Sequence, residues 1–369
     1  MVYNLRRKSM SEQYDLITYI GRFSGFHIAH EAIVRQALKL AKFVHIVIGS
    51  ANEPATCKNP FSYAQRTDMI LVCFSPKEQA RLSFSANEDW LYDENKWNQN
   101  VHSQVSSCVA NHNLDFGKFG LIGYDKDASS YYLKQFPNWD FVKGISLGNI
   151  SSTTIRNQWY EQGRICVSEF LPPAVGQYLQ QYSDQLAPLI GNLSELYKQQ
   201  QNLDKRWSGS PYPPIFKTVD AYVTRKINDI NHILLVHRRD NNLFALPGGY
   251  LDVDETLEAG IKRELLEETN LDIGNHKPTY SSHQFDHPRR SQKGRLITTV
   301  FRYDLDIIMS NFGEFTIDIK AGDDAQDAFW VPLRELKRSN MHDDHFQIIN
   351  FMTEKTNTEK TNHSPLTIA

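Results

Sequence analysis

The stretch Gly249–Leu271 restricts the fold and chemistry of this chain more than any other. It reads GYLDVDETLEAGIKRELLEETNL, and its apolar residues Leu257, Ile261 and Leu265 recur every four positions. This spacing predicts a helix over 255–269 with one apolar stripe that faces a core.

Three carboxylates share another face of the same helix. Glu264, Glu267 and Glu268 lie at i, i+3 and i+4, which are neighbouring positions on a helix surface. Like charges at this spacing destabilise a helix by about 0.2–0.5 kcal/mol per pair. A divalent cation such as Mg²⁺ or Mn²⁺ reverses that sign, because it prefers clustered oxygen ligands together with substrate phosphates. A solvated acidic face would explain the three glutamates alone, but not the glycine, glutamate and arginine that precede them at fixed offsets.

The stretch resembles the Nudix box, the signature of hydrolases that split a diphosphate joined to a nucleoside and another group. The match is complete except at the final glycine, where Asn270 stands. Asn is the next-best residue for the left-handed conformation that ends a helix, so we expect this difference to have little effect on the motif. The resemblance implies an α/β/α sandwich with a mixed sheet. It implies metal binding by Glu264, Glu267, Glu268 and the Gly249 carbonyl, catalysis by Glu267 and Glu268, and a structural role for Glu255 and Arg263.

Composition limits the class of protein and its partners. The 369 residues are long enough for two domains, and a net charge of −3 argues against a nucleic-acid partner. We find no apolar run of the length of a membrane span. No apolar segment of a signal peptide follows Met1–Met10, which we interpret as a disordered leader or as preceding a start at Met10. The four scattered cysteines indicate free thiols and a cytoplasmic location.

The N-terminal part begins with a strand–helix–strand pattern. Tyr14–Ile20 is a short apolar run that breaks at Gly21, residues 31–42 show helical spacing, and Val44–Gly49 is a second apolar run. This order predicts the βαβ unit of a doubly wound, Rossmann-like parallel sheet.

The turn between the first strand and the helix reads GRFSGFHIAH and spans Gly21–His30. Its two histidines, His27 and His30, lie three apart at a helix N-terminus, beside backbone N–H groups that favour negative charge. Imidazoles placed there can donate to the oxygens of a phosphate under attack. Two ordinary surface histidines would explain an HxxH pair alone, but the position after GRF at a strand end favours a polyphosphate site.

This decamer resembles the phosphate-binding motif of the nucleotidyltransferase superfamily, in the GRFQPFHxGH form of the nicotinamide mononucleotide (NMN) adenylyltransferases. The resemblance implies catalysis by His27 and His30 and substrate contacts from Gly21, Arg22 and Phe23. Ser24, Gly25 and Ala29 replace the usual Gln, Pro and Gly. We expect Gly25 to loosen the loop and Ala29 to crowd the phosphates, so both would weaken ATP binding.

A second marker of the same superfamily follows a strand-like segment at Phe141–Leu147. Ile150–Arg156 reads ISSTTIR and fits the marker without a mismatch. The hydroxyls of Ser151, Ser152 and Thr153 are expected to cap a helix, and Arg156 to offer fork-shaped donors to phosphate oxygens. The resemblance implies that this turn closes over the triphosphate, with the three hydroxyl residues binding substrate and Arg156 taking part in catalysis. A Ser/Thr cap with a surface arginine would explain the heptamer alone, but not its occurrence in this frame.

Weaker segments lie between the two markers. The resemblance suggests that Arg66 is near the ligand, that Trp97 stacks on the nicotinamide ring, and that Asp93 orients the ribose or the carboxamide. It also suggests Lys126 and Asp127 as contacts to adenine or ribose, in a segment where Tyr124 replaces the family's usual His.

These patterns divide the chain into four parts. We predict a nucleotidyltransferase domain over 12–185, a linker with a helix over 186–212, a Nudix domain over 213–350 and a disordered polar tail over 351–369. Strands are expected at 217–224, 232–239, 243–249 and 295–305, the first two antiparallel. The general base of hydrolysis is left open among the box glutamates and Glu314, Asp323 and Asp324.

Together the motifs resemble the bifunctional NMN adenylyltransferase/ADP-ribose pyrophosphatases of bacteria. The resemblance implies NAD and pyrophosphate synthesis from ATP and NMN, and hydrolysis of ADP-ribose to AMP and ribose 5-phosphate. It implies Mg²⁺ or Mn²⁺ in both domains, carried largely by the triphosphate of ATP in the first. Trp97 and the YYL segment argue against another nucleotidyltransferase, of the pantetheine phosphate or flavin type. Two alternatives stay open for the Nudix half: it acts on NADH or dinucleoside polyphosphates, or it senses a ligand. The sequence is compatible with a homo-oligomer but does not give the oligomeric state.

Overall fold

The computed structural model describes residues 13–114, 117–123, 136, 138–148, 150–312, 319–320 and 325–362. Its contacts divide the chain into two compact units, Met1–Asn202 and Leu203–Ala369, and the division falls within the predicted linker. In the ranges described, no helix is both long and apolar enough to cross a membrane.

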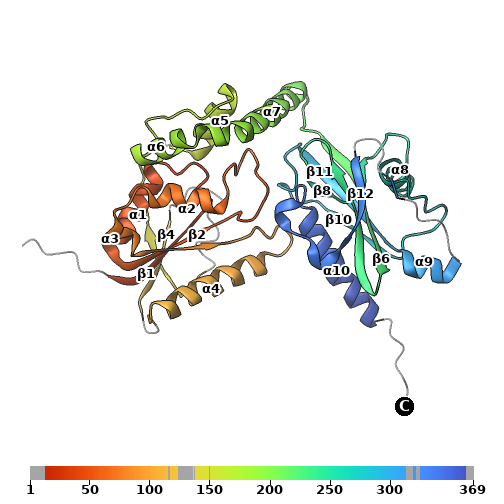
Figure 1. The fold of residues 1–369 in the computed structure, drawn as a ribbon, viewed down its shortest axis with the longest axis horizontal. Coiled ribbons are helices and arrows are strands. Elements are labelled where there is room, and N and C mark those ends of the chain that lie inside the picture. Colours follow the sequence, from red (N-terminus) through yellow and green to blue (C-terminus); the bar gives the residue numbers. More distant parts are fainter. Residues whose placement is uncertain are drawn as a thin grey trace, which may run out of the picture. The chain divides into compact units, whose positions relative to one another are not determined.

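The N-terminal unit is built on a parallel sheet with the strand order β3-β2-β1-β4-β5 (Figure 1). Its strands are β1 (Tyr14–Gly21), β2 (Ala41–Ile48), β3 (Leu82–Ala86), β4 (Phe119–Gly123) and β5 (Asp140–Lys143). Helix α1 (Ile28–Leu40) connects β1 to β2. The predicted βαβ unit and Rossmann-like sheet are therefore confirmed.

Helices cover both faces of this sheet because β1 is apolar on both sides. Ile17 packs in one core with α1, and Leu16 packs in another with α4 (Glu94–Asn111). Such two-sided burial is the usual setting of a parallel sheet. The remaining helices are α2 (Tyr63–Leu71), α3 (Pro76–Gln79), α5 (Ser152–Gln162), α6 (Pro173–Gln181) and α7 (Ser183–Trp207).

Helix α7 extends the N-terminal unit beyond the predicted boundary at 185. Leu186, Ile190 and Leu193 recur at i, i+4 and i+7 on α7, and all three are buried in the same core as α1. The first half of the predicted linker is therefore part of the N-terminal core.

The C-terminal unit is built on a mixed sheet with the path β10-β11-β6-β7-β12. Its strands are β6 (Ile215–Ile227), β7 (Ile230–Arg238), β8 (Phe244–Ala245), β9 (Gly248–Tyr250), β10 (Tyr280–Phe285), β11 (Arg295–Asp304) and β12 (Ala325–Pro332). Strands β6 and β7 are antiparallel, as predicted, whereas β11 runs parallel to β6. Short strands β8 and β9 pair with β7 and β6 respectively.

Alternation along β6 places helices on opposite faces of this sheet. Val219 and Ala221 pack in the core that contains α8 (Leu257–Thr269), the predicted Nudix-box helix. Tyr222, on the other face, forms a hydrogen bond through its hydroxyl with Thr353 of α10 (His345–Asn362). The predicted α/β/α sandwich is thus confirmed (Figure 1). Shorter helices are α9 (Leu305–Phe312), η2 (Leu333–Glu335) and η3 (Arg338–Asn340).

The prediction of a disordered tail over 351–369 is wrong for residues 351–362. These residues belong to α10, where Met352 is fully buried and the Phe351 ring contacts Phe285 edge-on. The Thr356 hydroxyl also accepts a hydrogen bond from the buried Arg302. The polar composition did not indicate this helix, because Thr353 and Thr356 pack against the sheet through hydrogen bonds with Tyr222 and Arg302.

Candidate active sites

The two histidines of the first predicted motif cap helix α1. The His27 Nδ1 accepts a hydrogen bond from the His30 backbone N–H at 3.4 Å, and the His30 Nδ1 accepts one from the His27 N–H at 3.5 Å. The Ile28 N–H donates to the Phe170 carbonyl. The expected open N–H groups of the first turn are therefore partly occupied, because the imidazoles cap the helix as Ser and Glu do in a capping box.

This arrangement determines the protonation of His30. Burial, with the charges of His27 and Arg156, holds the pKa of His30 well below its usual range. A neutral imidazole that accepts at Nδ1 carries its proton on Nε2. The two rings stack with centroids 3.7 Å apart. His30 is thus prepared to donate from Nε2.

The GRFSG loop is held in place by the second motif. Gly25 has φ +95°, a conformation that proline cannot adopt, so the glycine changes the loop relative to the family's usual proline. The Ser152 hydroxyl donates to the Gly25 carbonyl at 3.1 Å. Ser151 is the N-cap of α5 and accepts from the Thr153 N–H at 3.1 Å. The predicted hydroxyl cap is present, and it lies against the first motif.

Two buried arginines fasten the same loop. Arg66 donates to the carbonyls of Arg22, Gly49 and Ser50, and Arg156 donates to those of Ser24 and Cys57. Arg156 also donates to the Thr153 hydroxyl at 3.4 Å, so it reaches the first turn of its own helix as predicted. Both residues therefore position the loop, a role that the sequence did not show.

These arginines also concentrate positive charge at the end of the sheet. Burial, together with the charge of Arg22, lowers the pKa of Arg66 and of Arg156 to about 10. Arg66 and Arg156 therefore remain cationic at neutral pH. Mutual repulsion of this kind is relieved by a polyanion.

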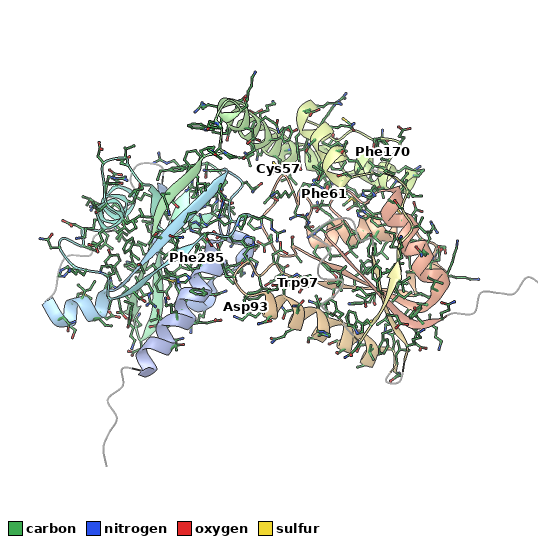
Figure 2. All side chains as sticks on the ribbon, turned by 180° about the vertical axis from the view of Figure 1, so that it is seen from behind. Cys57, Phe61, Asp93, Trp97, Phe170 and Phe285 are labelled. Carbon is green, nitrogen blue, oxygen red and sulfur yellow. The ribbon has the colours of Figure 1, made fainter. Side chains whose placement is uncertain are left out.

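Asp93 and Trp97 lie at the N-terminal end of α4 (Figure 2). Asp93 is the N-cap of α4, accepts from the Lys96 N–H at 3.1 Å and pairs with its ammonium at 3.5 Å. Trp97 is partly buried against the core beneath α4. The ligand contacts of both remain predictions, as do those of Gly21, Arg22 and Phe23. The candidates Lys126, Asp127, Glu314, Asp323 and Asp324 lie outside the described residues.

Sequence reasoning missed two polar groups of this unit. The Asn87 Nδ2 and the Asn98 Oδ1 are buried and have no hydrogen-bond partner within the ranges that the structure describes. Asn87 directly follows β3, and Asn98 is next to Trp97 on α4. Unpaired buried amides are costly unless a ligand satisfies them. For Asn98, its position next to Trp97, the predicted stacking residue, could have indicated a place in the site.

In the C-terminal unit, the glycines of β9 meet the carboxylates of α8. A Cβ on Gly249 would lie 2.6 Å from the Glu264 Oε1, so only glycine allows this approach. The Gly248 N–H donates to the Glu268 Oε2 at 2.9 Å. Burial raises the pKa of Glu264, and it raises that of Glu268 to about 8, with the neighbouring Glu264 charge adding to the shift.

Arg263 braces this segment as predicted. It binds both oxygens of Glu255 at 3.1 and 2.6 Å and the Tyr250 carbonyl at 3.1 Å. Its Nη1 donates to Glu264 and Glu267 at 2.8 and 2.9 Å. One guanidinium thus links the loop to the helix. Asn270 ends α8 with φ +57°, the left-handed conformation expected for it.

The chemistry of these groups fits a hard divalent cation. Three carboxylates, those of Glu255, Glu264 and Glu267, surround the single guanidinium of Arg263, which leaves negative charge in excess. In the described part of the chain, no three His, Cys, Asp or Glu side chains converge into a group that would hold a metal by themselves. Two features explain this. The expected ligand set includes the Gly249 backbone carbonyl, and Arg263 is hydrogen-bonded to carboxylate oxygens that a cation would need.

Comparisons with known proteins identify both units. A family model for cytidylyltransferase-like domains matches residues 18–158, and one for NUDIX domains matches residues 216–351. A crystal structure of a bifunctional NMN adenylyltransferase/ADP ribose pyrophosphatase from Francisella tularensis, complexed with AMP and a Mn ion, shares 30% identity and a TM-score of 0.80. The match covers 93% of this chain and 99% of that one. This chain belongs to that bifunctional family.

Relatives of the separate halves agree with this assignment. A nicotinamide/nicotinic acid mononucleotide adenylyltransferase from Acinetobacter baylyi is 38% identical over 189 residues, which are 51% of this bifunctional chain and 93% of that protein. An ADP-ribose pyrophosphatase from Methanocaldococcus jannaschii is 37% identical over 124 residues, which are 32% of this chain and 64% of that protein.

Proposed function

We propose that the N-terminal domain transfers the adenylyl group of ATP to NMN, and that the C-terminal domain hydrolyses ADP-ribose to AMP and ribose 5-phosphate. One observation carries the proposal: the chain has two sites of opposite charge. An arginine–histidine corner suits a polyphosphate, and an acidic helix suits a divalent cation.

In adenylyl transfer, a phosphate oxygen of NMN attacks the α-phosphorus of ATP. A new P–O bond forms, the bond to the bridging oxygen breaks, and pyrophosphate leaves. The neutral His30, donating from Nε2, and the cationic Arg156 stabilise the charge that develops on the phosphorus oxygens. His27 acts beside His30 because their rings are stacked. Catalysis here is alignment and charge neutralisation.

In hydrolysis, the oxygen of a water attacks one phosphorus and the bridging P–O bond breaks. We assign the binding of Mg²⁺ or Mn²⁺ to Glu264, Glu267, Glu268 and the Gly249 carbonyl. The cation, when bound, supplies polarisation of the diphosphate and activation of the water. Glu255 holds Arg263, and Arg263 fixes the loop against α8.

No observation favours the alternatives for the C-terminal domain. A ligand sensor does not need the box carboxylates, yet Glu264, Glu267 and Glu268 are all present, and two of them are buried. The assignment of nucleotides as ligands rests on membership of the bifunctional family. A cytoplasmic location, suggested by four free cysteines, and the absence of a nucleic-acid partner are parts of the proposal.

Chromatography of reaction products tests the proposal. We expect NAD and pyrophosphate from ATP, Mg²⁺ and NMN, formed faster than the nicotinate analogue in a parallel reaction. We expect AMP and ribose 5-phosphate from ADP-ribose and Mg²⁺ or Mn²⁺. Absence of a dinucleotide from either mononucleotide would refute the first activity and point to the effect of Ser24, Gly25 and Ala29. Intact ADP-ribose would refute the second.

A further inference from the structure

The amide of Asn87, directly after β3, is buried with a donor that no described residue accepts. Its side chain is fully buried. Its backbone is fixed, because its N–H donates to the Ile48 carbonyl at 2.9 Å and its carbonyl accepts from the Ala51 N–H at 3.0 Å. Within the described ranges, its Nδ2 has no acceptor. A buried polar group in this state costs about 1–3 kcal/mol, so the amide favours a ligand that brings an acceptor.

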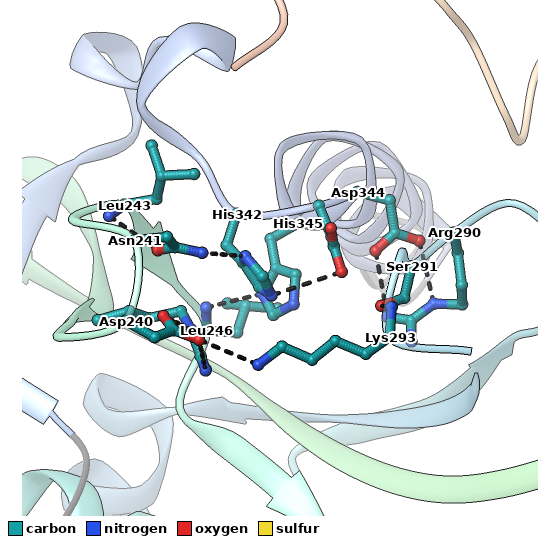
Figure 3. Close-up of polar contacts among 12 residues, drawn as sticks. Asp240, Asn241, Leu243, Leu246, Arg290, Ser291, Lys293, His342, Asp344 and His345 are labelled. Carbon is teal, nitrogen blue, oxygen red and sulfur yellow. Dashed lines mark hydrogen bonds and ion pairs between the residues drawn. The ribbon is translucent and has the colours of Figure 1, made fainter. Parts of the chain in front are cut away.

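The largest buried polar cluster of the C-terminal unit is paired, in contrast. Arg290 donates from Nε and Nη2 to the two oxygens of Asp344, both at 3.1 Å, and all of these groups are buried. The buried His345 accepts from the Leu246 N–H at 3.0 Å (Figure 3). Buried polar groups are usually satisfied in this way within the protein. Asn87 departs from that pattern.

Gln104 of α4 fixes the orientation of the Asn87 amide. The Gln104 Nε2 donates to the Ala86 carbonyl at 2.8 Å and to the Asn87 Oδ1 at 3.5 Å. A carbonyl can only accept, so the Gln104 atom at this position is the nitrogen. The Asn87 atom next to that nitrogen must also accept, so it is the oxygen. The Asn87 Nδ2 is therefore directed away from Gln104.

A chain of hydrogen bonds behind Gln104 has the same direction. The Ser85 hydroxyl donates to the Gln104 Oε1 at 2.9 Å and lies 3.0 Å from the His45 Nε2. Because Ser85 uses its hydrogen on Gln104, it accepts from His45. The Nδ1 of a neutral His45 then accepts from the Ser83 hydroxyl, 2.8 Å away. Each group donates to the next one toward Asn87, and the chain ends at the Asn87 Nδ2.

This donor lies at the end of the sheet to which α4 brings Trp97. Ser83 of β3 lies 3.2 Å from the Cys108 Sγ. Ser85, further along β3, contacts Gln104, which precedes Cys108 on α4. Helix α4 therefore runs antiparallel to β3, and its N-terminal end passes the carboxyl end of the strand, where ligands bind in open α/β sheets. Trp97 lies at that end of α4 (Figure 2), seven residues before Gln104 and thus on the same helix face.

We propose that the Asn87 Nδ2 donates a hydrogen bond to an oxygen of the pyridine substituent of the mononucleotide, and that Gln104 is a positioning residue for Asn87. This inference rests on the proposed adenylyl transfer and adds a specificity-determining residue to it. The carboxamide of NMN and the carboxylate of its nicotinate analogue both have such an oxygen. A donor at this position suits both, whereas an acceptor would suit only the carboxamide, which also has N–H groups.

The test compares Asn87→Asp with Asn192→Asp in the full-length protein, with NMN and the nicotinate analogue as alternative substrates. Asn192 is an exposed residue of α7, so it controls for a new carboxylate on the same domain. Asn87→Asp keeps the shape of the side chain and turns an oxygen toward the ligand. The carboxamide can rotate and donate to that oxygen, but the carboxylate is repelled by it.

We therefore expect a change of specificity in one variant only. The ratio of kcat/KM for NMN to that for the nicotinate analogue should rise by at least about 10-fold in Asn87→Asp and stay at the wild-type value in Asn192→Asp. Retained activity on NMN would exclude misfolding as the cause. The same ratio in both variants would overturn the inference.

Two further variants test the donor and its support. Asn87→Leu removes the donor at similar size, and we expect the KM for NMN to rise about 10-fold while the KM for ATP stays unchanged. Gln104→Leu should raise the KM for NMN less, because the amide remains but is no longer held. A purely structural role would affect both substrates alike, and an unchanged KM for NMN in Asn87→Leu would refute the hydrogen bond.

Binding of NMN alone separates this inference from the proposed reaction. In calorimetric titrations without ATP, we expect Asn87→Leu to bind NMN more weakly than the wild-type protein and Asn192→Asp do. If the wild-type protein forms no dinucleotide but this difference in binding is found, the proposed reaction fails and the inference stands. Equal binding of NMN by the two variants, or no binding by the wild-type protein, would contradict the inference.

Discussion

A missing side chain shapes the Nudix site. Gly249 lies where β9 passes under the Glu264 carboxylate, and a Cβ there would meet both carboxylate oxygens at 2.6 and 2.8 Å. Glu264 is itself nearly buried and held by Arg263, so it has little freedom to withdraw. The glycine thus sets the distance between a backbone carbonyl and a carboxylate that are expected to bind one cation.

Replacing Gly249 by Ala should therefore damage hydrolysis specifically. We expect Gly249→Ala to lower the rate of ADP-ribose hydrolysis by at least about 100-fold, because displacement of the carboxylate removes charge stabilisation. NAD formation, assayed on the same preparation, should not change. Gly209→Ala is the matched control, since a Cβ at Gly209 meets nothing within 4 Å. Equal hydrolysis by the two variants would contradict this account of Gly249.

At the scale of single elements, β2 carries a buried histidine that makes folding sensitive to acid. The His45 Nδ1 and Nε2 lie 2.8 and 3.0 Å from the hydroxyls of Ser83 and Ser85 on β3. Burial, together with the charge of His112, lowers the pKa of His45 to about 4. As the pH falls, His45 therefore becomes protonated near pH 6.5 in the unfolded chain but only near pH 4 in the folded chain.

Acidification should destabilise this domain in that window. The contribution of His45 is fully present above pH 6.5, and we expect a loss of about 3 kcal/mol in the free energy of unfolding between pH 6.5 and 4. Urea unfolding at several pH values measures it. His45→Asn keeps polar contacts without a titrating group, so its stability should fall less over the same range. Parallel pH profiles for the two proteins would disprove the assignment.

Local patterns predicted most elements of the fold. The period-four apolar residues of α8, the cap at Asn270 and the alternating strands β6 and β7 depend on neighbours in sequence, and all three are present. The helical tail did not follow from its sequence, because its stability comes from Arg302 and Phe285 on distant strands. Polar composition alone could not reveal those partners.

In the candidate sites, too, contacts between residues far apart in sequence could not be predicted. Spacing brought the Nudix glutamates together and placed His27 beside His30, because each set lies on one helix. The carbonyl contacts of Arg66 join positions 16, 17 and 44 residues apart. Contacts of this range depend on how the strands pair, which single motifs do not encode.

At the scale of the whole molecule, the chain carries two chemistries on two separate folding units. Each unit has its own sheet and its own core, and each candidate site lies within one unit. The histidine corner belongs to the parallel sheet, and the acidic helix belongs to the mixed sheet. We therefore expect the two activities to be independently removable.

The most direct test assays both reactions on two full-length variants, His30→Ala and Glu268→Gln. We expect His30→Ala to lose NAD formation and to hydrolyse ADP-ribose at the wild-type rate. Glu268→Gln should lose hydrolysis and form NAD at the wild-type rate. Each variant then serves as the folding control of the other. Loss of both activities in either variant, or retention of both, would contradict the two-site account.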